Sequence, residues 1–167
     1  MQGLSVRPAT PADATAIIEM LQALARFERA PGAVRLTEQT LVDDAFGETP
    51  RFHVFLAETG DGIPCGVATA ILAYSSWAAR PVLTLHDLFV RPQARRTGAG
   101  RAILAAVTAF ANARDCCRID VNVLSWNGDA ERFYRSQGFQ PLEEWRPFRL
   151  DLEGPTPPEN PSNRDPG

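Results

Sequence analysis

The chain contains no lysine, and arginine supplies all 17 of its permanently basic side chains. A lysine nucleophile or a lysine Schiff base is therefore excluded. No apolar run approaches the length of a membrane-spanning helix, and the N-terminal residues MQGLSVRPAT lack the apolar stretch of a signal peptide. We therefore expect a cytoplasmic protein that does not bind a membrane.

Cysteine is scarce, with residues only at Cys65, Cys116 and Cys117. An odd number with two adjacent members suits neither disulfide pairing nor a metal site, so we expect reduced thiols and no metal. The net charge of −3 argues against a nucleic-acid-binding protein. The 167 residues, 44% of them hydrophobic, suffice for one domain with a full core.

Hydrophobic periodicity predicts the order β-α-α-β-β-β-α-β-α-β-β. This order indicates an α/β (α+β) domain with a mixed, mostly antiparallel sheet of about seven strands and flanking helices. We assign residues 1–153 to this domain and expect the proline-rich tail at 154–167 to be disordered. The predicted strands are 4–7, 51–56, 66–74, 82–90, 118–124, 139–142 and 145–152, and the predicted helices are 11–28, 37–47, 100–115 and 127–137.

The stretch LHDLFVRPQARRTGAGR, residues 85–101, joins a predicted strand to a predicted helix through a basic turn with two glycines. A helix N-terminus has unpaired N–H groups and favours anions, and glycine allows close approach, so this pattern predicts a site for a phosphorylated ligand. It is neither a dinucleotide fingerprint nor a Walker loop. A plain turn with solvated arginines is one alternative. A nucleic-acid patch is another, but no run of aromatic residues for base stacking flanks it.

Residues 95–100, Arg-x-x-Gly-x-Gly after a strand, resemble the acetyl-CoA signature of the GNAT superfamily of N-acetyltransferases. A second block is in register with the segment N-x-x-A-x-x-F-Y-x-x-x-G-F of the same family: Asn127, Ala130, Phe133, Tyr134, Gly138 and Phe139. The chain is most similar to the diamine (spermidine/spermine) and thialysine acetyltransferases, over residues 4–152. Strings that carry this likeness include LARFE at 24–28, LHDLFV at 85–90 and EEWRPFRLD at 143–151. The resemblance implies the GNAT fold, acetyl-CoA as co-substrate and a homodimer, with the 145–152 strand at its interface.

The resemblance also implies which groups bind the co-substrate. Backbone groups of Leu88, Phe89 and Val90 would hold the pantetheine arm and polarise the acetyl carbonyl, and Asn127 would contact the cofactor besides capping a helix. Tyr134, whose ordinary pKa of ~10 keeps it protonated at neutral pH, would protonate the departing thiolate. Without the resemblance, Phe133 and Tyr134 would be assigned to the core. The loop that would hold the pyrophosphate comprises Arg95, Arg96, Thr97, Gly98, Ala99, Gly100 and Arg101.

An acceptor pocket follows from the same resemblance, with carboxylates to anchor an ammonium group. Taken alone, Glu28 and Asp87 would be charges at a helix end and a strand end. Diamine acetyltransferases have glutamate where this chain has His86, so the loss of one carboxylate favours a smaller or mono-cationic amine. His86 is a candidate base for the amine proton, or else a structural histidine. The implied acceptor residues are Phe27, Glu28, Trp77, His86, Asp87, Asp120, Asn122 and Glu144.

The sequence thus predicts an N-acetyltransferase that moves an acetyl group from acetyl-CoA to the primary amine of a small cationic acceptor, either a diamine or polyamine or a thialysine- or lysine-like amine. The cysteines show no partner arrangement for an acyl-enzyme, so direct transfer in a ternary complex is expected. Two alternatives stay open. An acetyltransferase of protein lysines or N-termini would need an open groove, and a non-catalytic acyl-CoA-binding domain would have no use for Tyr134.

Overall fold

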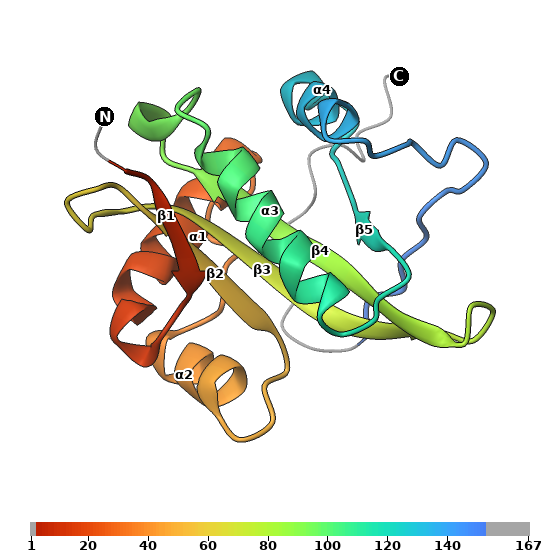
Figure 1. Ribbon diagram of the computed structural model, residues 1–167, viewed down its shortest axis with the longest axis horizontal. Coiled ribbons are helices and arrows are strands. Elements are labelled where there is room, and N and C mark those ends of the chain that lie inside the picture. The colour runs from red at the N-terminus through yellow and green to blue at the C-terminus, as the bar shows by residue number, and fades with distance from the viewer. Residues whose placement is uncertain (1–2, 153–167) are drawn as a thin grey trace.

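The computed structural model describes residues 3–152, so the predicted tail at 154–167 lies outside the described residues. Its single sheet has the strand order β1-β2-β3-β4-β5 (Figure 1). Neighbours from β1 to β4 are antiparallel, and β5 is parallel to β4. The predicted mixed, mostly antiparallel sheet is confirmed, with five strands instead of about seven. The strands are β1 (Ser5–Pro8), β2 (His53–Glu58), β3 (Pro64–Ser75), β4 (Arg80–Val90) and β5 (Ile119–Val121).

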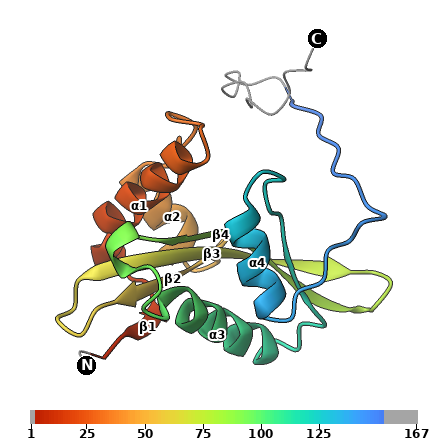
Figure 2. The ribbon, with the colours of Figure 1, turned by 90° about the horizontal axis from the view of Figure 1, so that it is seen from above.

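Four α-helices flank this sheet, with α1 and α2 on one face and α3 on the other (Figure 2). The helix predicted at 11–28 begins as a short 3-10 turn, Pro11–Asp13, in which Asp13 accepts a hydrogen bond from the backbone N–H of Thr10 at 2.7 Å, and the α-helix itself begins at Ala14. The predicted start of α2 is confirmed, because the Thr37 side chain accepts a hydrogen bond from the backbone N–H of Thr40 at 3.1 Å. Such caps satisfy backbone donors that the helix leaves unpaired. The helices are α1 (Ala14–Phe27), α2 (Glu38–Phe46), α3 (Ala99–Asn112) and α4 (Gly128–Ser136).

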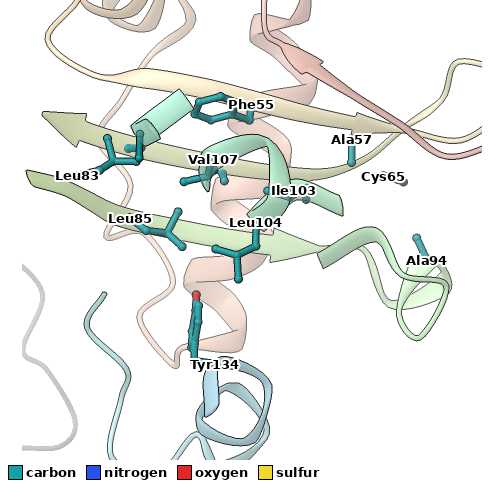
Figure 3. Packing of buried hydrophobic residues seen from close by; sticks show 13 residues of the cluster. Phe55, Ala57, Cys65, Leu83, Leu85, Ala94, Ile103, Leu104, Val107 and Tyr134 are labelled. Carbon is teal, nitrogen blue, oxygen red and sulfur yellow. The ribbon is translucent and has the colours of Figure 1, made fainter. Parts of the chain in front are cut away.

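The core has two parts because both faces of the sheet are covered. Alternation along β2 sends Val54 and Leu56 toward α1 and α2, and Phe55 and Ala57 toward α3. On the α3 side, the fully buried Ile103 packs with Val107, Leu83 and Leu85 (Figure 3). The apolar stripe of α3 therefore packs against the apolar residues of the strands, as the sequence predicts.

The two closing strands predicted at 139–142 and 145–152 do not form. Their apolar alternation is real, but a strand needs a neighbour for its backbone hydrogen bonds, and no part of the described chain supplies one. Every residue from 140 to 152 is exposed, including five large apolar side chains: Leu142, Trp145, Phe148, Leu150 and Leu152.

The strand β4 departs from regular pairing at two places. Leu85 pairs with Ala70 and Asp87 with Thr69, so His86 is an extra residue, which makes a β-bulge. On its other side, β4 pairs with β5 only from Leu83 to Leu85. Beyond this point, that edge of β4 has no strand partner among the described residues.

Candidate active site

The loop between β4 and α3 has the geometry of an anion site. Gly98 caps α3 with φ 96°, and Arg96 also has a positive φ of 65°. The hydroxyl of Thr97 donates to the carbonyl of Ala94 at 2.7 Å, which holds the turn. The first amides of α3 have no partner within the helix, and the exposed Arg95, Arg96 and Arg101 surround them. These groups fit a pyrophosphate.

The two glycines of this loop should respond differently to substitution. We expect Gly98→Ala to lower the free energy of unfolding by about 1–2 kcal/mol, because its φ is costly for an L-residue. No atom lies within 4 Å of the added Cβ, so the cost is conformational. Gly100→Ala is the matched control, since its Cβ would lie at an ordinary 3.5 Å from Phe133. Urea unfolding of both variants measures the difference, and equal losses would contradict this account.

The free edge of β4 fits the predicted role of residues 88–90. Leu88, Phe89 and Val90 pair with β3 on one side, where their partners are Ala68, Val67 and Gly66. On the side toward β5 their backbone groups have no strand partner in the described chain, so they can bind a ligand's amides. Arg95 already reaches this edge, since its Nε donates to the Val90 carbonyl at 3.1 Å.

Tyr134 belongs to α4 and is buried in the cluster that α3 forms with the sheet. Its ring packs edge-on against Phe133 and Phe139, with centroids 5.2 and 5.3 Å apart, and its hydroxyl is directed from α4 toward the sheet (Figure 3). Burial raises the pKa of Tyr134 to about 12, and the negative charges of Asp87 and Glu28 add to the shift. The phenol is therefore protonated throughout the neutral range, as a proton donor must be.

Asp87 organises the acceptor side. Its Oδ2 accepts a hydrogen bond from the hydroxyl of Thr69 at 2.5 Å and lies 3.1 Å from Nδ1 of His86. The hydrogen bond to Asp87 raises the pKa of His86, burial opposes this, and the charges of Asp87 and Glu28 reinforce it. The bulge turns His86 outward, where its side chain is 64% exposed. His86 is therefore not a buried structural histidine.

Glu28 joins this group from the end of α1. It is half-buried, and its pKa is raised by burial and by the charge of Asp87, while His86 opposes the shift. Mutual electrostatic effects of this kind require the groups to be close. Three distant segments thus bring Glu28, His86, Asp87 and Tyr134 within electrostatic range of one another.

Aromatic side chains form one wall beside this group. Phe27 and Trp126 have ring centroids 5.8 Å apart, and the guanidinium of Arg95 lies 5.5 Å from the Phe27 centroid. Trp126 belongs to the loop between β5 and α4, which rises on the α1 side of the sheet (Figure 2). Asn127, next in this loop, accepts a hydrogen bond from the backbone of Ala130 at 3.1 Å, as its predicted capping role requires.

Comparison with known proteins agrees with this geometry. The model of the acetyltransferase (GNAT) family matches residues 15–139. The chain belongs to this family. It is therefore an acetyl-transferring enzyme, and the predicted GNAT fold is confirmed. The residues that form the anion loop, the free β4 edge and the Tyr134 group lie almost entirely within the matched range.

The relatives of this acetyltransferase are named for different amines. The thialysine N-epsilon-acetyltransferase of Mus musculus is 33% identical over 163 residues, or 92% of this chain and 95% of that protein. The spermidine/spermine N(1)-acetyltransferase-like protein 1 of Homo sapiens is 29% identical over 162 residues, covering 92% of this chain and 23% of that protein. An aminoglycoside acetyltransferase from an uncultured soil metagenomic sample, solved in complex with sisomicin, matches with a TM-score of 0.75 at 18% identity, covering 90% of this chain and 97% of that one.

Two predicted acceptor residues of the acetyltransferase lie away from the Tyr134 group. Trp77 is 95% exposed at the tip of the β3–β4 hairpin, which projects beyond the other strands (Figure 1). Glu144 is exposed in the segment where the closing strands do not form. Neither side chain has a recorded contact with the Tyr134 group, and their role in binding an acceptor stays a prediction.

Asp120 lies on β5, the neighbour of the strand that contains His86, and Asn122 follows directly after β5. Asp120 is level with Thr84 in the β4–β5 ladder, and Nε of Arg118 donates to its carboxylate at 2.9 Å. Asn122 is exposed one residue beyond β5. Their contact with an acceptor stays a prediction.

Three residues of the acetyltransferase site were not predicted: Thr69, Trp126 and Arg29. Thr69 is a buried polar residue inside an apolar strand, and a lone hydroxyl in such a run is the signal that could have pointed to it. Trp126 precedes the Asn127 cap and was visible as part of that block. Arg29 follows Glu28 directly, but nothing in the sequence shows that its guanidinium lies against Trp126.

Other features concern the whole described range of this acetyltransferase. Within residues 3–152, no cluster of three or more His, Cys, Asp or Glu side chains could hold a metal ion, and the three cysteines are free. None of the helices described there is long and apolar enough to cross a membrane. One surface hollow lies along α3 and extends to Phe139, and another lies beside Cys65, Arg91 and Thr97.

Proposed function

We propose that this enzyme transfers an acetyl group from acetyl-CoA directly to the primary amine of a small cationic acceptor, within a ternary complex. Acetyl-CoA supplies an acetyl thioester, which is reactive toward amines. One observation carries the proposal: a protonated phenol, two carboxylates and an imidazole meet beside the unpaired edge of β4. The named activities of the thialysine and spermidine/spermine relatives support a small amine as acceptor.

The chain would hold the co-substrate along one continuous path. The amides at the start of α3 and the arginines of residues 95–101 would bind the pyrophosphate. Free backbone groups of residues 88–90 would pair with the pantetheine arm, and an N–H among them would polarise the acetyl carbonyl. A preset backbone donor of this kind is commonly a large contribution to catalysis. Asn127 would contact the same ligand from the start of α4.

On the acceptor side, Glu28 and Asp87 would attract and orient the cationic amine. The amine must lose a proton before it attacks, and His86 would accept that proton directly or through a water molecule. Asp87 would hold the imidazole by its Nδ1 atom and stabilise the imidazolium that results. Thr69, through its hydrogen bond to Asp87, positions this carboxylate.

Tyr134 would then donate its proton to the departing thiolate. Its pKa is raised partly by the charges of Asp87 and Glu28. Positive charge that develops on the attacking nitrogen would offset both carboxylates, so the Tyr134 phenol becomes a better acid as the bond forms. Attack by the acceptor amine would thus increase the acidity of the Tyr134 phenol, which then protonates the thiolate.

A steady-state assay with a free-thiol readout tests this proposal. The panel comprises thialysine, lysine, ornithine, spermidine, simple diamines and peptides with free amines. We expect turnover on the small amines, with intersecting initial-velocity patterns when both substrates are varied. Parallel patterns would indicate an acyl-enzyme instead. Turnover restricted to peptides, or binding of acetyl-CoA without turnover, would replace the proposal by one of the two alternatives.

We further propose that the enzyme is a cytoplasmic homodimer. Two exposed apolar segments of the same chain support a dimer, because large apolar surfaces on soluble proteins are usually covered by a partner. One segment lies in the β3–β4 hairpin, and the other is the region where the closing strands do not form. The exposed apolar side chains are Ile71, Leu72, Tyr74 and Trp77 in the first, and Leu142, Trp145, Phe148, Leu150 and Leu152 in the second.

Sedimentation of the purified chain tests the dimer. We expect a mass twice the 18.3 kDa of one chain. The double variant Trp145→Ser/Phe148→Ser should shift the equilibrium toward the monomer, since it removes apolar area from the contact. Ile63→Ser is the matched control, because Ile63 is an exposed apolar residue, 57% accessible, in the β2–β3 turn. A wild-type chain that sediments as a monomer at all concentrations would contradict the proposal.

A further inference from the structure

The side chain of Arg95 lies against the free edge of β4. Its Nε donates a hydrogen bond to the carbonyl of Val90 at 3.1 Å. Its guanidinium carbon also lies 5.9 Å from the ring centroid of Phe89 and 5.5 Å from that of Phe27, at the end of α1. Both distances are within the range of cation–π contacts. These contacts hold the guanidinium beside the strand edge, although the residue as a whole is exposed.

The carbonyl of Val90 is one of the groups that a ligand at this edge would use. The backbone N–H of Arg91 donates to the Cys65 carbonyl on β3 at 2.9 Å. Successive residues of a strand direct their backbone polar groups to opposite sides, so the N–H and carbonyl of Val90 face away from β3. A pantetheine amide that pairs with residues 88–90 would donate to this carbonyl. Arg95 and the pantetheine arm therefore compete for the same acceptor and the space beside it.

The positive charge of Arg95 is available to an anion. Its two Nη groups have no acceptor within residues 3–152. None of the ion pairs in that range includes Arg95. A hydrogen bond from a guanidinium to a phosphate oxygen is stronger than one to a neutral carbonyl, and the fork of an arginine fits phosphate well. Because Arg95 belongs to the loop that would bind the pyrophosphate, a donor with phosphate groups offers its side chain a better partner than Val90.

We propose that Arg95 makes the enzyme specific for phosphorylated thioesters. Its side chain covers the pantetheine edge of β4, and a pyrophosphate at the start of α3 draws it away. A thioester without phosphate groups has to displace the same side chain without that compensation, so the occupied edge discriminates against it. This inference rests on the proposed function of the same site. In this role Arg95 determines specificity for the acyl donor and takes no part in proton transfer.

Acetyl-CoA and S-acetylpantetheine test the inference, because they share the thioester and the pantetheine arm but only acetyl-CoA carries phosphates. With a saturating amine, Arg95→Ala should have opposite effects on the two donors. We expect kcat/KM for acetyl-CoA to fall about 10- to 100-fold, the range for a charge-assisted hydrogen bond. We expect kcat/KM for S-acetylpantetheine to rise about 3- to 10-fold, since this donor no longer has to break the hydrogen bond to Val90.

A second variant separates the two contributions of Arg95. Arg95→Lys keeps the positive charge for a phosphate, but an ammonium group lacks the planar fork that lies against the two rings and the Val90 carbonyl. This variant should therefore gain with S-acetylpantetheine as Arg95→Ala does, and should lose less with acetyl-CoA.

Arg114→Ala is the matched control. The Arg114 guanidinium also lies over a phenylalanine ring, 3.4 Å from the Phe110 centroid, and also donates to a backbone carbonyl, that of Phe110 at 3.4 Å. It lies just beyond the C-terminal end of α3, at the opposite end of this helix from the anion loop. Its removal should leave kcat/KM unchanged for both donors, and circular dichroism should show that all three variants are folded.

Two results would overturn the inference. Losses with both donors in Arg95→Ala would indicate a structural role, and a loss with acetyl-CoA without a gain for S-acetylpantetheine would indicate a phosphate ligand that does not cover the edge. In both cases the wild-type activity with acetyl-CoA would stay intact. Absence of thiol release from acetyl-CoA with every amine would instead refute the proposed function.

Discussion

Replacement of Tyr134 by phenylalanine is expected to lower kcat by about 10²- to 10⁴-fold, the contribution typical of a positioned acid or base. The variant loses the phenol proton but keeps the ring contacts with Phe133 and Phe139. The Tyr134 hydroxyl makes no hydrogen bond to another described residue, so its removal leaves no partner unsatisfied. Stability and acetyl-CoA affinity should therefore stay close to those of the wild type.

The chain offers a close control for this experiment. Its other tyrosine, Tyr74, is 67% exposed on β3 near the hairpin tip, away from the site. Tyr74→Phe removes the same atom and should change neither kcat nor acetyl-CoA binding. Stopped-flow single turnovers separate chemistry from product release for both variants. An unchanged chemical step in Tyr134→Phe would show that another group, or water, protonates the thiolate.

Much of the fold could be predicted from the sequence because local signals and tertiary packing agree. The helix at α3 follows from its apolar stripe, and the α2 start follows from Thr37. The strands β2 and β4 were predictable because alternation and apolar runs mark strands that are covered on both faces. The prediction of the two closing strands was wrong because it used local alternation alone. Alternation in residues 145–152 does not show whether a neighbouring strand exists.

The site was predictable to a different extent. The anion loop and Tyr134 are continuous blocks of sequence whose local geometry is set by nearby residues. The acceptor side is assembled from distant segments, and no local pattern reports its contacts. The β4 bulge illustrates this, because one extra residue relative to β3 turns His86 outward, and such a register change is invisible in one strand alone. Trp77 shows the converse, since its assignment to the pocket came from resemblance and the hairpin places it elsewhere.

Asp87→Asn is the second substitution with a large expected effect. It keeps a side chain that can accept the Thr69 hydrogen bond but removes the charge that lies beside His86 and that we propose attracts the cationic acceptor. We expect kcat/KM for the amine to fall about 30- to 1,000-fold, the range for losing one member of a close charge pair. Asp61→Asn is the matched control, because Asp61 also accepts a hydrogen bond from a threonine hydroxyl, that of Thr59 at 2.5 Å, but lies in the turn between β2 and β3.

The pH dependence of the same variants tests whether His86 is the base. Asp87 raises the pKa of His86, so the neutral, active imidazole is lost at a higher pH on acidification than an ordinary histidine would show. Removing the carboxylate lowers this pKa, and the acid limb of kcat/KM should move to lower pH in Asp87→Asn. His86→Ala should abolish the limb, and Asp61→Asn should leave it in place. The pKa of the amine itself is common to all variants, so any shift between them belongs to the enzyme. Superimposable profiles for the wild type, Asp87→Asn and His86→Ala would exclude His86 as the base and assign proton removal to solvent.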